Sequence, residues 1–163
     1  MNTIKIYGDN YFGHHSITRT ACRAIIINDD MILMSYEKNT GQYMFPGGGL
    51  EVNETITQCV KREVEEETGY LIDADACVLQ IDEYYEDEKY INKYCFGKIV
   101  GQGKIKLTTR EKSVGMEPKW ITIDEAISIF SNHESYRNVD EMRRGMYYRE
   151  YTALKNLLFQ HLY

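Results

Sequence analysis

Four glutamates crowd the segment KREVEEETGY (61–70), at positions 63, 65, 66 and 67. On a helix that turns ~100° per residue, Glu63 and Glu67 fall within the apolar stripe and Glu66 lies at its edge. Glu65 points the opposite way. The apolar stripe consists of Ile56, Cys59, Val60 and Val64. The pattern therefore predicts that Glu63, Glu66 and Glu67 share the inward face of a helix.

Carboxylates on an inward face need a partner, because an ionised group removed from water is costly unless it is paired. A divalent cation would resolve this conflict, and clustered carboxylate oxygens select hard ions such as Mg²⁺ or Mn²⁺. The alternative is an ordinary glutamate-rich helix whose charges are solvated, and the helix alone leaves both interpretations open. The preceding loop FPGGGLE (45–51) favours a site, because three glycines allow close approach of a ligand to the backbone.

The elements that position these residues follow from local patterns. A helix is expected over residues 53–68, with Asn53 as the N-cap and Gly69 as the C-terminal stop. A second, short helix over 124–130 is expected to be capped by Asp124. The remaining expected elements are an N-terminal arm at 1–18 with a strand at 4–7, strands at 20–28, 31–37, 76–86, 90–100 and 118–123, and a C-terminal helix at 140–163. Intermixed strands and helices predict an α/β or α+β fold with a mixed sheet.

Composition limits the class of protein. A chain of 163 residues with 43% hydrophobic and 27% charged residues suits a single globular domain over 1–163. A net charge of −6 argues against a nucleic-acid polymer as partner. No apolar segment has the length of a signal peptide or a membrane span, so we expect a soluble, cytoplasmic protein. The four cysteines show no C-x-x-C pair and are expected to be buried free thiols.

The run GGLEVNETITQCVKREVEEETGY (48–70) resembles the Nudix box, G-x5-E-x7-R-E-U-x-E-E-x-G-U, where U is a bulky apolar residue. The matching positions are Gly48, Glu54, Arg62, Glu63, Val64, Glu66, Glu67 and Gly69. Tyr70 departs mildly, being aromatic where an aliphatic residue is usual. The FPGG sequence at the start of the box and the W-x-x-x-x-E-A pattern at 120–126 are also similar to such hydrolases.

This resemblance implies an α/β/α sandwich with a mixed sheet and a loop–helix–loop box. It also implies a Mg²⁺- or Mn²⁺-dependent hydrolase that cleaves the pyrophosphate bond of a nucleoside diphosphate linked to another moiety. Nucleoside triphosphates, dinucleoside polyphosphates and nucleotide sugars are substrates of this type. Many relatives are dimers, so a homodimer is compatible with the resemblance. An alternative is a non-catalytic sensor that binds nucleotides or metabolites on the same fold.

The resemblance also assigns roles to residues of the box. Glu63, Glu66 and Glu67 are expected to bind the metal, joined by the carbonyl of Gly48. Glu63 is alternatively the general base. Arg62 is expected to orient the glutamates, whereas Glu54 is mainly structural.

Residues outside the box carry weaker signals. Relatives often use a further acidic ligand or base from a loop, and Glu111 and Glu117 are candidates. The alternative for each is an ordinary solvated glutamate, which explains it at least as well. Tyr85 lies sixteen residues after Gly69, a placement similar to that in dinucleoside polyphosphate hydrolases. Its ring could stack on a nucleobase, although a half-exposed strand tyrosine explains it as well.

Overall fold

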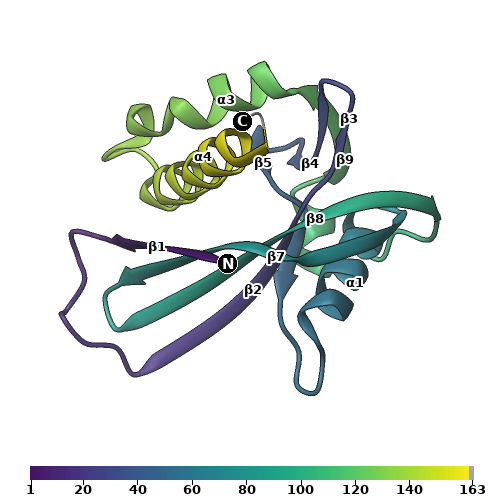
Figure 1. Ribbon diagram of the computed structural model, residues 1–163. Coiled ribbons are helices and arrows are strands. Elements are labelled where there is room, and N and C mark those ends of the chain that lie inside the picture. Colours follow the sequence, from purple (N-terminus) through teal and green to yellow (C-terminus); the bar gives the residue numbers. More distant parts are fainter. Residues whose placement is uncertain (162–163) are drawn as a thin grey trace.

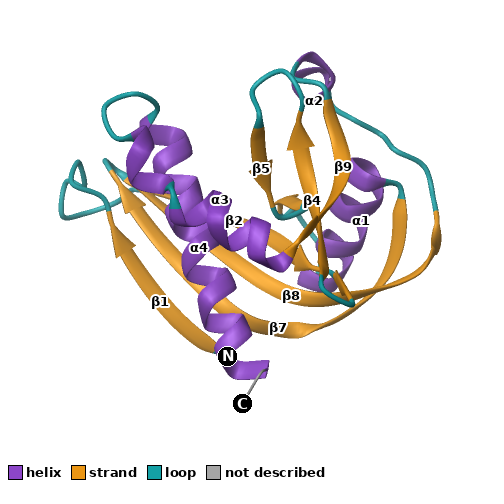
Figure 2. Ribbon diagram, turned by 90° about the horizontal axis from the view of Figure 1, so that it is seen from above, coloured by secondary structure: helices purple, strands orange, loops and turns teal. Residues whose placement is uncertain are grey.

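The computed structural model describes residues 1–161, which form two β-sheets with helices on both sides (Figures 1 and 2). This arrangement confirms the expected α/β class with a mixed sheet. The expected C-terminal helix is present as α4, and residues 162–163 of that prediction lie outside the described residues.

The larger sheet, sheet A, has the strand order β1-β7-β8-β2-β6. The pairs β1–β7 and β2–β8 are parallel, whereas β7–β8 and β2–β6 are antiparallel. Its strands are β1 (Asn2–Tyr7), β2 (Ile17–Ile25), β6 (Gly47–Gly49), β7 (Tyr70–Tyr85) and β8 (Glu88–Gln102). The long β7–β8 hairpin forms its centre, so both expected hairpin strands are present and extend further than predicted.

The smaller sheet, sheet B, is built around β4, which pairs antiparallel with its three neighbours. Its strands are β3 (Ile27–Asn28), β4 (Met31–Glu37), β5 (Gln42–Met44) and β9 (Met116–Thr122). The bounds of β4 are those expected from the sequence.

The helices divide the apolar side chains into two cores. They are α1 (Ile56–Thr68), α2 (Thr109–Ser113), α3 (Ile123–Ser131) and α4 (Glu141–His161), together with a 3-10 turn at His133–Tyr136. Figure 1 shows α1 on one side of sheet A and α3 and α4 on the other. Because successive strand residues face opposite sides, Ala24 and Leu33 enter the core beneath α1, whereas Ile25 and Met34 enter the core beneath α4. Strands β2 and β4 are thereby fixed against α1.

Helix α1 begins later than expected, and the predicted caps of both α1 and α3 are wrong. The N-cap of α1 is Thr55, whose hydroxyl accepts from the Gln58 N–H at 3.2 Å while the Gln58 side chain accepts from the Thr55 N–H at 2.8 Å. Asn53 instead lies in a turn with φ of 64°. Helix α3 starts from Thr122 rather than Asp124, again with a reciprocal pair of bonds. In both helices the Thr side chain accepts from one backbone N–H and the Gln or Glu three residues later accepts from another. A lone Asn or Asp cap can satisfy only one of these donors.

The prediction that Gly69 ends α1 is confirmed, because this residue adopts the left-handed conformation with φ of 76°. Helix α2 lies in a segment for which no helix is expected from the sequence.

The prediction of four free thiols is wrong for two of them. Cys77 and Cys95 form a disulfide between β7 and β8, where the strand register places them opposite each other. Directly opposed residues of an antiparallel pair have neighbouring Cβ atoms, and this proximity depends on a register that single-sequence spacing does not reveal. Cys22 and Cys59 are free and buried, as expected.

Within residues 1–161, none of the helices combines the length and the apolar character that crossing a bilayer requires.

The cap of α1 can be tested by stability. Replacing Thr55 with Ala removes the hydroxyl that accepts from Gln58, and we expect the free energy of unfolding to fall by about 1 kcal/mol. Asn53→Gly is the matched control, since glycine adopts a positive φ at no steric cost. Chemical denaturation monitored by circular dichroism measures both variants. A larger loss for the Asn53 variant than for the Thr55 variant would contradict the cap assignment.

Candidate functional site

Strand β6 brings the backbone unusually close to its neighbours. A Cβ on Gly47 would lie 2.1 Å from the carbonyl oxygen of Cys22 on the adjacent strand β2. A Cβ on Gly48 would lie 2.5 Å from the carboxyl carbon of Glu63. A side chain at Gly47 would collide with the backbone of β2, and a side chain at Gly48 would displace the Glu63 carboxylate. The glycines thus allow α1 to place a carboxylate directly against the strand.

Arg62 is the centre of the site. Its Nε and Nη2 donate to the two carboxylate oxygens of Glu54 at 2.7 and 3.0 Å, a bidentate pair. Its Nη1 donates to Glu63 at 2.6 Å and to Glu66 at 3.3 Å, and Nη2 also donates to the Gly49 carbonyl at 3.0 Å. These bonds, that to Glu54 above all, raise the pKa of Arg62 further above its ordinary value. The structure therefore brings Arg62, Glu63 and Glu66 together.

Burial differs among the three glutamates of the inward face. The side chain of Glu66 is 29% exposed and that of Glu63 is 12% exposed, whereas Glu67 is only 3% exposed. Burial raises the pKa of Glu63, and the charges of Glu66 and Glu111 act in the same direction, while Arg62 opposes them. The order of burial agrees with the helical face expected from the sequence.

Glu67 lies beneath the other two glutamates and joins α1 to both sheets. One carboxylate oxygen accepts from the Ser35 hydroxyl of β4 at 2.7 Å and from the Gly47 N–H of β6 at 3.1 Å. Burial raises the pKa of Glu67 to about 8, although both hydrogen bonds act against the shift. Ser35 was not identified from the sequence, and its only signal is a hydroxyl within the apolar strand MILMSYE.

The two acidic candidates outside the box lie in different places. The pKa values of Glu63 and Glu67 are raised mainly by burial, and the charge of Glu111, on α2, adds to both shifts. The Lys106 N–H, in the segment leading to α2, donates to the Glu66 carbonyl at 2.8 Å, so this segment lies against α1. Glu117 pairs in register with Tyr36 and forms an exposed ion pair with Lys38 at 3.7 Å. Because Tyr36 and Ser35 face opposite sides of sheet B, Glu117 is directed away from Glu67.

Tyr85 ends β7, at the opposite end of that strand from α1 (Figure 2). Its hydroxyl donates to Glu83 at 3.2 Å. The Tyr85 side chain lies so close to Gly8 and Gly145 that a Cβ at either position would crowd it. Burial, with the charge of Glu83, raises its pKa above the ordinary value. The structure does not bring Tyr85 to the glutamates, and its role in substrate binding stays a prediction.

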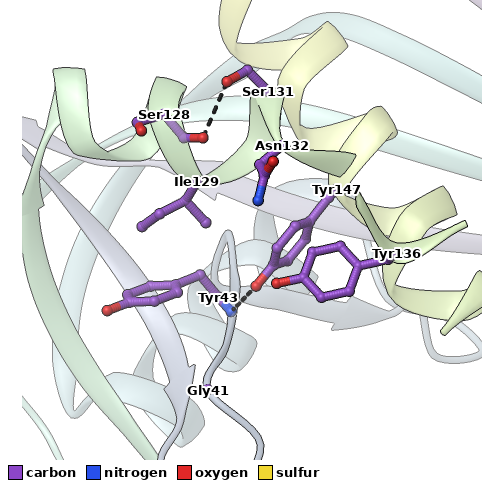
Figure 3. Close-up of a pocket in the computed structure, with 8 residues that line it drawn as sticks. All are labelled: Gly41, Tyr43, Ser128, Ile129, Ser131, Asn132, Tyr136 and Tyr147. Carbon is purple, nitrogen blue, oxygen red and sulfur yellow. Dashed lines mark hydrogen bonds between the residues drawn. The ribbon is translucent and has the colours of Figure 1, made fainter. Parts of the chain in front are cut away.

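A cavity of about 510 Å³ opens between β5, α3 and α4 (Figure 3). Tyr43, Tyr136 and Tyr147 form its aromatic wall, and the Tyr43 N–H donates to the Tyr147 hydroxyl at 3.1 Å. Tyr43 pairs with Tyr36, on the face of sheet B that is turned away from Glu67. None of the glutamates of α1 lines this cavity, so the carboxylate cluster is separate from it.

Comparison with known proteins agrees with this geometry. A family model described as the NUDIX domain matches residues 17–142, which is more than half of the chain. The chain belongs to the Nudix family.

Two curated relatives are similar over part of their length. The NAD-capped RNA hydrolase NudC of Vibrio atlanticus (strain LGP32) is 36% identical over 78 residues, covering 38% of this chain and 29% of that protein. The mitochondrial Nudix hydrolase 12 of Arabidopsis thaliana is 26% identical over 125 residues, covering 74% of this chain and 62% of that protein. The chain thus spans less than two thirds of either Nudix relative.

Among solved structures, a NUDIX hydrolase from Nitrosomonas europaea is similar in fold. It has a TM-score of 0.56 and 23% sequence identity, and the match covers 83% of this chain and 89% of that one.

The ion pair between Arg62 and Glu54 predicts a pH-dependent contribution to stability. The hydrogen bond from Arg62 lowers the pKa of Glu54 from 4.5 to about 2. Since this pKa is depressed in the folded state, the contribution is complete above pH 4.5 and is lost as the pH falls toward 2. We expect Glu54→Gln to lower the free energy of unfolding by about 1–3 kcal/mol at pH 7, with a difference that shrinks on acidification.

Denaturation at a series of pH values measures this effect. Glu51→Gln is the control, because Glu51 is exposed and stands 4.0 Å from Arg62. A loss for Glu54→Gln that stays constant down to pH 2 would contradict the assigned cause.

Proposed function

We propose that this protein is a Nudix hydrolase that cleaves the pyrophosphate bond of a nucleoside diphosphate linked to another moiety, using Mg²⁺ or Mn²⁺. The observation that carries the proposal is the carboxylate cluster of α1 pressed against the glycine strand and oriented by Arg62. A cluster that served only solubility would not need Glu63 and Glu67 to be buried or glycines to make room for them.

The residues present suit a hard divalent cation. Glu63, Glu66 and the Gly48 carbonyl offer oxygen donors only, the type that Mg²⁺ and Mn²⁺ prefer. Gly48 has no side chain that would keep a ligand from the Glu63 carboxylate. Among residues 1–161, however, no three His, Cys, Asp or Glu side chains already converge in metal-binding geometry. In this arrangement Arg62 shares its Nη1 between Glu63 and Glu66, so we infer that cation binding requires these carboxylates to turn from the guanidinium.

Each residue of the cluster then has a distinct task. Arg62 holds Glu63 and Glu66 in place before the cation binds and remains anchored by Glu54 afterwards. Glu67 is fixed by Ser35 and the Gly47 N–H, and nearby positive charge would favour its ionised form. Glu63 is either a metal ligand or the base that accepts a proton from the attacking water. The bound cation would screen the diphosphate charge and lower the pKa of that water.

Glu111 is the better of the two acidic candidates outside the box. Its charge influences Glu63 and Glu67, whereas Glu117 pairs with Lys38 on another face of sheet B. We therefore propose Glu111 as the further carboxylate of the site.

A product screen tests the proposal. The panel comprises nucleoside triphosphates, dinucleoside polyphosphates, ADP-ribose, nucleotide sugars and NAD, the last because the Vibrio relative is an NAD-capped RNA hydrolase. Each compound is incubated with Mg²⁺, Mn²⁺ or a chelator, and the products are separated by anion exchange. Metal-dependent release of a nucleoside monophosphate is the expected outcome. Binding of Mn²⁺ without turnover of any compound would favour a sensor instead.

Glu66→Gln tests the cluster directly. We expect this change to abolish turnover because it removes a ligand charge, while the melting temperature stays close to that of the wild type. Glu65→Gln is the matched control, since it is the same substitution one residue away. Within residues 1–161 its carboxylate accepts only a long 3.4 Å bond, from the Lys104 N–H. Turnover is measured on the substrate found in the screen. Metal-dependent activity retained by Glu66→Gln would exclude Glu66 from the reaction.

A further inference from the structure

Helix α2, which carries Glu111, has no apolar packing of its own. None of its five residues, Thr109–Ser113, is buried. A reciprocal bond pair at its start, between Thr108 and Glu111, satisfies its first backbone donors but does not attach it to the rest of the molecule. So short a helix is not stable by itself in water. Its position must therefore come from polar contacts with neighbouring elements.

Those contacts converge on the end of β4. Glu37, the last residue of that strand, has a side chain that is only 2% exposed. One of its carboxylate oxygens accepts from the Thr40 hydroxyl at 2.9 Å, and the other accepts from Nη2 of Arg110 on α2 at 3.2 Å. The side chain of Arg110 is 66% exposed. A buried carboxylate thus has as its ion-pair partner a cation that reaches in from the surface.

Loss of this ion pair would cost Glu37 more than Arg110. An unpaired carboxylate at Glu37 would remain buried, which is costly, whereas Arg110 could return to solvent with little loss. The contact therefore draws α2 toward β4.

The turn after β4 secures the other end of α2. The Lys38 N–H donates to the Gly115 carbonyl at 3.2 Å and the Asn39 N–H donates to the Val114 carbonyl at 3.1 Å. The Asn39 side chain adds a bond to the Ser113 carbonyl at 2.8 Å. The segment Glu37–Asn39 therefore contacts α2 through Arg110 near its start and through residues 113–115 at its end. Figure 2 shows α2 at the end of sheet B where β4 and β9 lie.

Glu111 is the neighbour of Arg110 in the chain, so the position of one sets the position of the other. One oxygen of Glu111 accepts from the Thr108 N–H at 2.8 Å. Glu37 lies two residues after Ser35 on β4 and therefore on the same face of that strand. Ser35 donates to Glu67 at 2.7 Å, and the Lys106 N–H, shortly before α2, donates to the Glu66 carbonyl at 2.8 Å. These contacts place α2 beside the cluster on α1, in agreement with the effect of the Glu111 charge on the pKa of Glu63 and Glu67.

We infer that Glu37 is a positioning residue of this site. Through Arg110 it anchors α2 at the end of β4, and the anchored helix holds the Glu111 carboxylate toward Glu63 and Glu67. This inference rests on the proposed function for its effect on turnover, whereas the anchor itself does not.

A double-mutant cycle tests the effect on turnover. We expect Arg110→Ala and Glu37→Gln each to lower kcat about ten-fold, the usual scale for residues that orient a ligand. Combining Arg110→Ala with Glu111→Gln should lower kcat no further than Glu111→Gln alone, because both act through one carboxylate. Arg110→Lys, which keeps the charge, should restore part of the loss. Effects that multiply in the double variant, or an unchanged kcat in Arg110→Ala, would overturn the inference.

Lys112→Ala is the matched control. It removes one positive charge from the same exposed helix, and Lys112 forms no ion pair among the residues that the structure describes. Its kcat should equal that of the wild type. Glu37→Gln removes the buried charge, whereas Arg110→Ala leaves that charge without its partner but opens no buried space. Because the two variants would disturb folding for different reasons, the same loss of kcat in both, with unchanged circular dichroism, excludes misfolding as its cause.

Hydrogen exchange tests the anchor without substrate or metal. The amides of Lys112, Val114 and Gly115 donate within α2, and we expect all three to exchange faster in Arg110→Ala than in Lys112→Ala. Equal exchange in the two variants would overturn the anchor. If the wild type turns over no compound of the panel, the proposed function fails, and this measurement still decides whether Glu37 holds α2.

Discussion

The guanidinium of Arg62 donates to Glu54, Glu63 and Glu66 and to the carbonyl of Gly49, so one cation joins the loop before α1, the inward face of α1 and strand β6. Like charges one turn apart on a helix repel one another. Arg62 offsets that repulsion while its planar fork fixes the direction of each carboxylate. A lysine would supply the charge without this geometry. The arrangement of the three glutamates therefore depends on the planar shape of the guanidinium as much as on its charge.

Glu67 sets the second constraint, because it is buried where the two sheets meet. Its carboxylate accepts from Ser35 of sheet B and from Gly47 of sheet A. Any shift of α1 along its axis would break both bonds and leave a buried carboxyl group without partners, which costs several kcal/mol. The helix is therefore held in register with both sheets through a polar contact. Apolar packing of Val60 and Val64 fixes which face is inward, but it would tolerate small displacements that these bonds do not.

Much of this could be predicted from the sequence, because helical periodicity depends only on residue type and spacing. The inward face of α1, the strand β4 and the C-terminal stop at Gly69 all follow from such local rules. The caps at Thr55 and Thr122 are also encoded locally, because each threonine precedes a Gln or Glu by three residues. Asn53 and Asp124 match the general preference for Asn or Asp at a helix start, and this preference led to the wrong prediction. The Cys77–Cys95 disulfide, Ser35 and the placement of Glu111 depend on strand register and on contacts between distant segments. Spacing in a single sequence does not contain that information.

The excess of negative charge around α1 explains why the proposed diphosphate substrate would need a cation in order to bind. Arg62 pairs with Glu54, Glu63 and Glu66, and the charges of Glu63 and Glu111 also act on Glu67. With a pKa of about 8, Glu67 is largely protonated at neutral pH, and this reduces the excess of negative charge without removing it. A diphosphate that approached such a surface alone would be repelled. In the proposed function the same excess would attract a divalent cation, and its charge would favour ionisation of Glu67 and offset the repulsion of the substrate. Buried carboxylates thus keep the cluster in a partly neutralised form, and the proposed substrate would need the cation, bound to the protein or to the diphosphate, in order to approach it.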